Sequence, residues 1–344
     1  MKGWRYMVIV AALLALLMLC GCSRSMIKED SVHEDLPEID PEAGVAKEVQ
    51  AKLYYRLTDE EYLVGVSVSV TVYAGEREEK AMIRSLIEGT PPLSGNISAV
   101  VPKNTEIIDV MLEGAIMYVT LSESFFDTSV MDKAVSDVSR LMENSMITKN
   151  EYEMRVQAAK KELYLSRRLA VESIVNTITA NNPDVKVQLL FELEGTAARV
   201  SRTELGLEGY GGSSHDLLEP MEFVGDCVIT PTAIADCVLG HMQRGEYDKA
   251  YPLIAELEQG GAQKPDYASF ETEAAALDRI RSYSIKGERA GEESGAIIVT
   301  AEITKADAAA GQRGQRHALS LKPEGSIYKV GYTSLLSALG GNGE

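Results

Sequence analysis

The stretch YLVGVSVSVTV, residues 62–72, alternates apolar and small polar side chains, and this pattern commits the chain to building a β-sheet. Tyr62 and the valines at every second position share one face of an extended segment, whereas Ser67, Ser69 and Thr71 share the other. Side chains of a strand point alternately to opposite faces, so the pattern indicates a half-buried strand. Helices cover such a sheet on one face only, which predicts an α+β fold whose other sheet face is hydrated.

The neighbouring sequence supplies the other elements of this first folded unit. Apolar alternation and turn residues predict four further strands, at residues 52–57, 106–112, 115–121 and 185–193. Apolar residues at helical spacing predict one helix, at residues 78–88. Lys186 and Gln188, in the last of these strands, are expected to share the hydrated face with the small polar residues of the first.

Two helices are predicted between the last two of these strands. Residues 131–142 repeat apolar side chains at helical spacing, and Thr148 with Glu151 has the spacing of a capping box that opens a second helix. The apolar stripe of the second helix changes phase, so we expect a break near Ser166. The sequence ANNP, residues 180–183, ends this helix.

The end of the second helix, ESIVNTITANN at residues 172–182, is rich in Ser, Thr and Asn, which are indifferent helix formers. Its apolar stripe is expected to bury one side and consists of Val171, Ile174, Val175 and Ile178. Ser173 and Asn176 lie opposite this stripe. We therefore expect these two side chains to be either solvated or available to a partner.

A second unit follows a connector at residues 201–229, which contains the Gly-rich sequence GYGGSS. Thr230 and Pro231 are a plausible N-cap and first residue of a helix. Three helices are expected, at residues 231–244, 247–259 and 267–280. Four strands are expected after them, near residues 282–287, 296–304, 317–322 and 327–332. The sequence SLLSAL predicts a final short helix.

The first 21 residues predict a signal peptide rather than part of the fold. Lys2 and Arg5 precede the apolar run 7–19, which is too short to span a membrane as a helix. The following LCGC resembles a bacterial lipobox, which implies lipidation of Cys22 and anchoring at the extracytoplasmic face of the cell membrane. The alternative is an ordinary signal peptide with a chance cysteine. Residues 22–50 are acidic and lack apolar periodicity, which predicts an extended tether.

The charge of the chain excludes several classes of partner. The full sequence has 34 Lys plus Arg and 52 Asp plus Glu, and removal of Lys2 and Arg5 with the signal leaves 32 against 52, a balance of −20. Nucleic acid requires a basic surface, and anionic lipid headgroups also repel such a chain. We therefore predict no nucleic-acid partner.

Few residues suggest chemistry. The sequence SSHD, residues 213–216, places Ser, His and Asp side by side in a Gly-rich connector, which cannot easily hold the geometry of a catalytic triad. The chain has four histidines: His33, His215, His241 and His317. No two of them have the spacing of metal ligands. Glu88, Glu113 and Glu123 lie at element ends and are expected to be exposed. Cys227 and Cys237 are expected to be free buried thiols rather than a bridge.

Four stretches resemble a GerM domain, the type found in bacterial sporulation and germination lipoproteins. They are KLYYRLTDEEYLVGVSVSV, AMIRSLIEGTPPLSG, VPKNTEIIDVMLEGAIMYVTLSESF and ESIVNTITANNPDVKVQLLFELEG. The resemblance implies a GerM-like α/β sandwich over residues 51–200, from which the helical insertion 132–163 departs. Residues 230–340 resemble a smaller NTF2-like α+β domain on the stretches MQRGEYDKAYPLI, SFETEAAALDRIRSYSI and IYKVGYTSL, and the resemblance implies a curved sheet around helices, of a kind able to enclose a pocket.

The resemblance implies a non-enzymatic cell-envelope lipoprotein with a binding or assembly role in sporulation or spore germination. Its partners would be envelope proteins, with self-association as a further option. Two alternatives stay open: a regulator or enzyme of peptidoglycan metabolism, and a lipoprotein that binds a small ligand in the C-terminal pocket. Cys22 is the only site residue predicted. No catalytic, cofactor-binding or metal-binding residue and no cofactor are expected.

Overall fold

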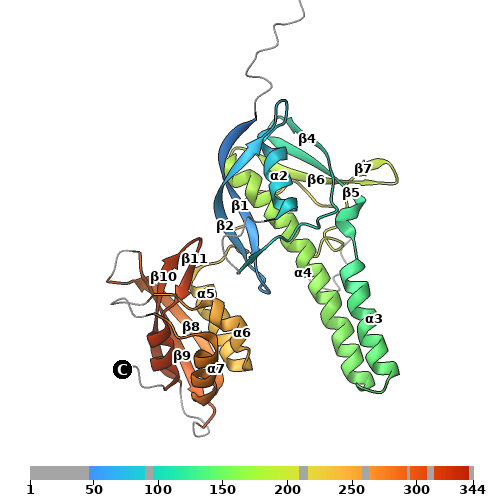
Figure 1. Cartoon of the computed structure of the whole chain (residues 1–344). Coiled ribbons are helices and arrows are strands. Elements are labelled where there is room, and N and C mark those ends of the chain that lie inside the picture. Colours follow the sequence, from blue (N-terminus) through green and yellow to red (C-terminus); the bar gives the residue numbers. More distant parts are fainter. Residues whose placement is uncertain are drawn as a thin grey trace, which may run out of the picture. The chain divides into compact units, whose positions relative to one another are not determined.

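The computed structural model describes residues 46–89, 96–208, 216–257, 263–292, 295–307 and 314–340 (Figure 1). The predictions for the signal peptide, for lipidation at Cys22 and for most of the tether lie outside these residues, as do His33 and residues 213–215 of SSHD. Within them, helices and three sheets alternate along the chain, which confirms the α+β class.

Two sheets form the first part of the fold. The first contains β1 (Lys47–Leu57), β2 (Leu63–Val72) and β3 (Ile97–Ser98) in the order β2-β1-β3. The second contains β4 (Ile107–Glu113), β5 (Ile116–Ser122), β6 (Lys186–Leu193) and β7 (Thr196–Ala198) in sequence order. β5 and β6 are parallel because a long helical connection separates them, whereas the other pairs are antiparallel. β1 begins at Lys47, so the last residues of the predicted tether belong to a strand.

The alternation that predicted β2 is confirmed. Val66 and Val70 are buried, whereas Ser67 and Ser69 are exposed. On the hydrated face, Ser69 and Thr71 donate hydrogen bonds to the carboxylate of Glu48. α2 (Glu78–Glu88) has the predicted bounds and packs against β1 and β2 with buried Met82, Ile83, Leu86 and Ile87.

Gln188 does not belong to a hydrated face, and this prediction was wrong. Gln188 is buried and donates hydrogen bonds to the backbone carbonyls of Leu189 and Leu218. Met221 also pairs with Val187 of β6. A segment that sequence analysis assigned to the connector therefore covers this side of the strand.

A helical hairpin connects β5 to β6. Its helices are α3 (Ser129–Glu143) and α4 (Lys149–Asn181), which lie side by side over the first half of α4 (Figure 1). The predicted capping box at the start of α4 is confirmed, since Thr148 and Glu151 bond reciprocally. The predicted break near Ser166 is absent, because α4 is one helix of 33 residues. Its apolar stripe changes phase because the first half contacts α3, whereas the second half contacts β1, α2 and β6.

The second half of α4 is buried on every side, over the whole span Leu169–Thr179. Polar groups in such a position require hydrogen-bond partners. Ser173 donates to the carbonyl of Tyr54, and Thr177 accepts from the amide of Tyr54 at 3.0 Å. Asn181 accepts from the amide of Lys52 at 3.0 Å and donates to its carbonyl at 2.9 Å. These residues are four apart, so they form one strip of the helix that bonds the edge of β1 not paired with β2.

The expectation that Ser173 and Asn176 are solvated or available to a partner is therefore wrong. Both side chains are 0% exposed. Asn176 accepts from the amide of Val224 at 2.7 Å and donates to its carbonyl at 2.8 Å. Small polar side chains are present in this helix because they satisfy the backbone of two segments that have no strand beside them there.

The described end of the connector packs against the first part of the fold. Leu63 donates to the carbonyl of Cys227 at 2.7 Å, and Ile229 donates to the carbonyl of Leu63 at 2.9 Å. α5 (Pro231–Arg244) follows at once and has the bounds predicted, with Thr230 accepting from the amide of Ala233 as N-cap.

The C-terminal part consists of helices against a sheet with the order β11-β10-β9-β8. The strands are antiparallel and span β8 (Ile280–Ala290), β9 (Ile297–Lys305), β10 (Gln315–Glu324) and β11 (Ile327–Val330). The helices after α5 are α6 (Tyr247–Ala250), the 3-10 turn Tyr251–Leu253, α7 (Tyr267–Ala276) and α8 (Tyr332–Leu339). α6 is much shorter than the predicted 247–259, since Pro252 lacks an amide and the chain is extended at Ile254.

Candidate functional site

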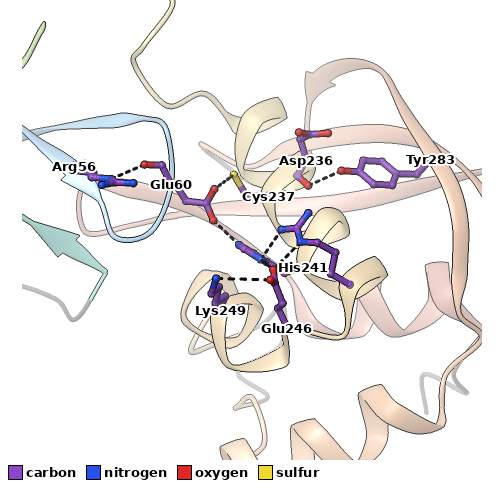
Figure 2. A network of polar contacts seen from close by, with 9 residues as sticks. Arg56, Glu60, Asp236, Cys237, His241, Glu246, Lys249 and Tyr283 are labelled. Atoms are coloured by element: carbon purple, nitrogen blue, oxygen red, sulfur yellow. Dashed lines mark hydrogen bonds and ion pairs between the residues drawn. The ribbon is translucent and has the colours of Figure 1, made fainter. Parts of the chain in front are cut away.

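His241, on the inner side of α5, lies between two carboxylates (Figure 2). Its Nε2 is 2.5 Å from Oε1 of Glu60, and its Nδ1 is 2.8 Å from Oε2 of Glu246. Cys237, one helical turn earlier, donates its thiol hydrogen to Oε2 of Glu60 at 3.4 Å. We call Glu60, Cys237, His241 and Glu246 the histidine clamp, because they join the turn after β1 to α5.

Glu60 reaches α5 from a shaped turn. The preceding Asp59 has a left-handed backbone, with φ of 62°. Arg56 donates its Nε hydrogen to the Glu60 carbonyl at 2.7 Å, and its Nη1 also bonds to Glu162 of α4. The turn that carries Glu60 is thus fixed from both sides.

The electrostatics of the clamp favour a protonated histidine. Burial lowers the pKa of His241, and so does the charge of Arg244, whose Nη2 is 3.0 Å from Nδ1; the hydrogen bonds to Glu60 and Glu246 outweigh both, and the net pKa is raised. Burial alone would likewise raise the pKa of Glu246, yet His241 and Arg244 lower it to about 2. Only an imidazolium donates from both ring nitrogens, so a charged His241 satisfies both carboxylates.

The geometry of the histidine clamp suits a structural contact between the turn after β1 and α5, and it does not activate Cys237 as a nucleophile. The thiol of Cys237 points to Glu60 and not to the imidazole, and burial followed by the charge of Glu60 raises its pKa. A nucleophilic cysteine needs a lowered pKa and a base within reach. Among the residues described, no group of three or more His, Cys, Asp or Glu is placed to hold a metal ion.

The α3–α4 hairpin presents the second candidate feature, an apolar surface. α3 repeats apolar residues at helical spacing, yet none of its residues is buried. The large apolar side chains that face solvent in the hairpin are Val130, Met146 and Met154, with exposed fractions of 84%, 70% and 64%. At its base the hairpin and residues 99–103 enclose a groove of about 410 Å³.

Apolar side chains of α5 and of the sheet are buried in the C-terminal part. Ile234 and Val238 of α5 and Val299 and Leu319 of the sheet are at most 1% exposed. A described cavity of about 480 Å³ lies instead at β10 and α8, where Ser320, Lys322 and Ser334 are among its lining residues.

Other sequence predictions have mixed outcomes. Cys227 and Cys237 are free and buried, which confirms the preference for free thiols. Glu88, Glu113 and Glu123 are exposed, as expected. His241 is 3% exposed, and the sequence did not reveal its carboxylate partners. The four-residue spacing of Cys237 and His241 on one helix was an available signal, whereas Glu60 lies 181 residues from His241.

The fold and these sites define an α+β protein whose first part is GerM-like. Residues 52–149 match the family described as "Germane: Sporulation and spore germination", which confirms the resemblance over that segment. No curated protein matches the chain. In the described residues, every helix is too short or too polar to cross a membrane.

Two solved structures are similar to part of the chain. The tandem GerMN domains of the sporulation protein GerM from Bacillus subtilis share 16% identity at a TM-score of 0.27, with 42% of this chain and 39% of that chain covered. A Clostridium perfringens protein described as a candidate lipoprotein shares 17% identity at a TM-score of 0.21, with 42% and 75% covered. This chain thus spans less than half the length of the first structure.

Proposed function

We propose that this chain is a non-enzymatic, lipid-anchored envelope protein of sporulation or spore germination that acts by binding other proteins. The family match over residues 52–149 supports the biological setting. The signal-like segment ending at Cys22 supports the anchor and the extracytoplasmic location. The partners are other envelope proteins or further copies of the chain.

The binding role rests on one observation, the amphipathic helix α3 without a buried residue. An amphipathic helix normally turns its apolar stripe toward a core. Here the α3–α4 contact leaves apolar side chains of both helices in solvent, Val130 on α3 and Met154 on α4. Exposed apolar surface of this kind often marks a protein interaction site. The exposed apolar surface of the hairpin therefore replaces residues 172–182 as the expected contact surface, because Ser173 and Asn176 are buried.

The parent protein for the experiment is the mature chain with Cys22→Ser, which removes the proposed lipidation site. It is compared with the same chain carrying the double substitution Val130→Ser/Met154→Gln. Both positions are exposed, so the fold should be unchanged in circular dichroism. Removal of two contact side chains should weaken association by roughly tenfold or more. Lys160→Gln, an exposed change on the same hairpin, is the matched control and should behave like the parent.

Association is measured by light scattering across concentrations and by quantitative cross-linked capture from membranes of the producing cells. A loss confined to the double variant supports the proposal. Monomers at every concentration, equal capture by all three proteins and hydrolysis of wall material by the pure chain would favour the enzyme instead.

A further inference from the structure

The groove at the base of the hairpin has the size and lining of a ligand site. Its volume of about 410 Å³ lies within the range of roughly 300–1,000 Å³ typical of small-molecule pockets. Most of the lining is apolar, and small side chains contribute much of it: Ala99, Ala134, Ala159 and Ala170, beside Val101 and Leu163. Alanines on facing elements leave room for a narrow aliphatic body.

Arg167 of α4 supplies the charged group in this lining. Its guanidinium lies over the rings of Phe126 and Tyr164, with its Cζ 5.2 and 5.8 Å from their centroids. Nη2 donates to the carbonyl of Phe126 at 2.9 Å, and Nη1 to the carbonyl of Glu204 at 3.4 Å. A guanidinium has five N–H groups: Nε is buried and its hydrogen has no acceptor among the described residues, and each Nη carries a second hydrogen beyond these two bonds.

The carboxylates in the lining are already engaged elsewhere. Glu162 bonds to Arg56 and Ser166, and Asp127 accepts from the amide and hydroxyl of Ser129. Within the described residues, no carboxylate forms an ion pair with Arg167. The half-buried guanidinium therefore has no ion-pair partner among the described residues, although the charge of Glu204 acts on it from nearby, and Lys103 adds a second positive charge to the lining.

We propose that this groove binds an amphipathic carboxylate, with an aliphatic chain along the alanines and a carboxylate head on Arg167. Arginine and carboxylate match in a bidentate, charge-assisted hydrogen bond, which is stronger where water is partly excluded. A ligand with the same chain but no charge leaves the guanidinium unpaired. The groove lining shares Val130 with the exposed hairpin surface proposed for association, whereas Met154 lies outside the lining and Arg167 is half-buried in it, so Arg167→Gln tests the ligand site separately.

The test uses dodecanoate below its micelle concentration and, as the uncharged probe of equal chain length, dodecanol. Titration calorimetry on the mature Cys22→Ser chain should show saturable dodecanoate binding, with dodecanol weaker by roughly ten- to a hundredfold. Arg167→Gln should reduce dodecanoate binding by a similar factor and remove the preference over dodecanol. Arg140→Gln, which removes an exposed arginine outside the groove lining, should leave both affinities unchanged.

A second variant keeps the test informative if Arg167→Gln unfolds. Ala159→Met extends a side chain into the groove without changing charge, and should reduce the affinity for both probes alike. Thermal melting and circular dichroism verify the fold of each variant. The proposal is overturned by an absence of saturable dodecanoate binding, by equal affinity for the two probes in the parent chain, or by binding that Ala159→Met leaves unchanged.

Discussion

Replacing Thr177 with valine tests how the polar side chains of α4 hold the edge of β1. Thr177 is 0% exposed, and its hydroxyl oxygen accepts the amide hydrogen of Tyr54 at 3.0 Å. Valine has nearly the same shape but no acceptor, so the change leaves a buried amide without a partner. Tyr54 itself is only 2% exposed, and its amide has no easy access to water.

The cost follows from the chemistry of that amide. Leaving a buried donor unsatisfied costs about 1–3 kcal/mol. With a urea m-value of about 2 kcal/mol/M, this lowers the unfolding midpoint by about 0.5–1.5 M. The amide of Tyr54 should also exchange its hydrogen faster in the variant, because the local bond that protects it is lost.

The same helix contains a matched control. Thr179 is 5% exposed, but its hydroxyl donates only to the carbonyl of Val175 within α4 at 2.7 Å. That carbonyl is four residues earlier, so Thr179→Val removes a local bond that helices do not depend on. We expect a change below about 0.5 kcal/mol. Equal destabilisation by the two substitutions, or a neutral Thr177→Val with unchanged Tyr54 exchange, would refute the role assigned to Thr177.

Three further predictions concern the anchor, the clamp and the connector. Cys22→Ala should release the protein into the aqueous fraction or leave an unprocessed precursor, and unchanged membrane retention would contradict lipidation. The raised pKa of His241 means that the clamp contributes its full stability below the ordinary pKa of 6.5 and loses it as pH rises through the higher folded pKa. The stability difference between the parent and His241→Gln in urea should therefore shrink with rising pH, and a difference that grows would be inconsistent with this sign. Limited proteolysis should cut first within residues 209–214 and leave a stable fragment on each side, whereas early cutting within residues 52–195 would argue against that boundary.

Local patterns were sufficient for much of the fold. The alternation in residues 62–72 fixed β2 and its buried face, because side-chain direction in a strand has a period of two. The capping box of Thr148 and Glu151 fixed the start of α4, and Thr230 with Pro231 fixed the start of α5. These features depend on neighbouring residues in the chain, so the sequence alone contains the information.

The tertiary structure decided which polar groups are buried and what they bond. Helical spacing showed that Ser173 and Asn176 lie opposite an apolar stripe, but spacing does not reveal whether another segment covers that side. Gln188 was misjudged for the same reason, since residues far along the chain cover it. The carboxylate that faces His241 comes from Glu60, 181 residues away, and only folding brings the two together. Periodicity records which side of an element is apolar, whereas the partner of a buried polar group depends on long-range packing that no local pattern specifies.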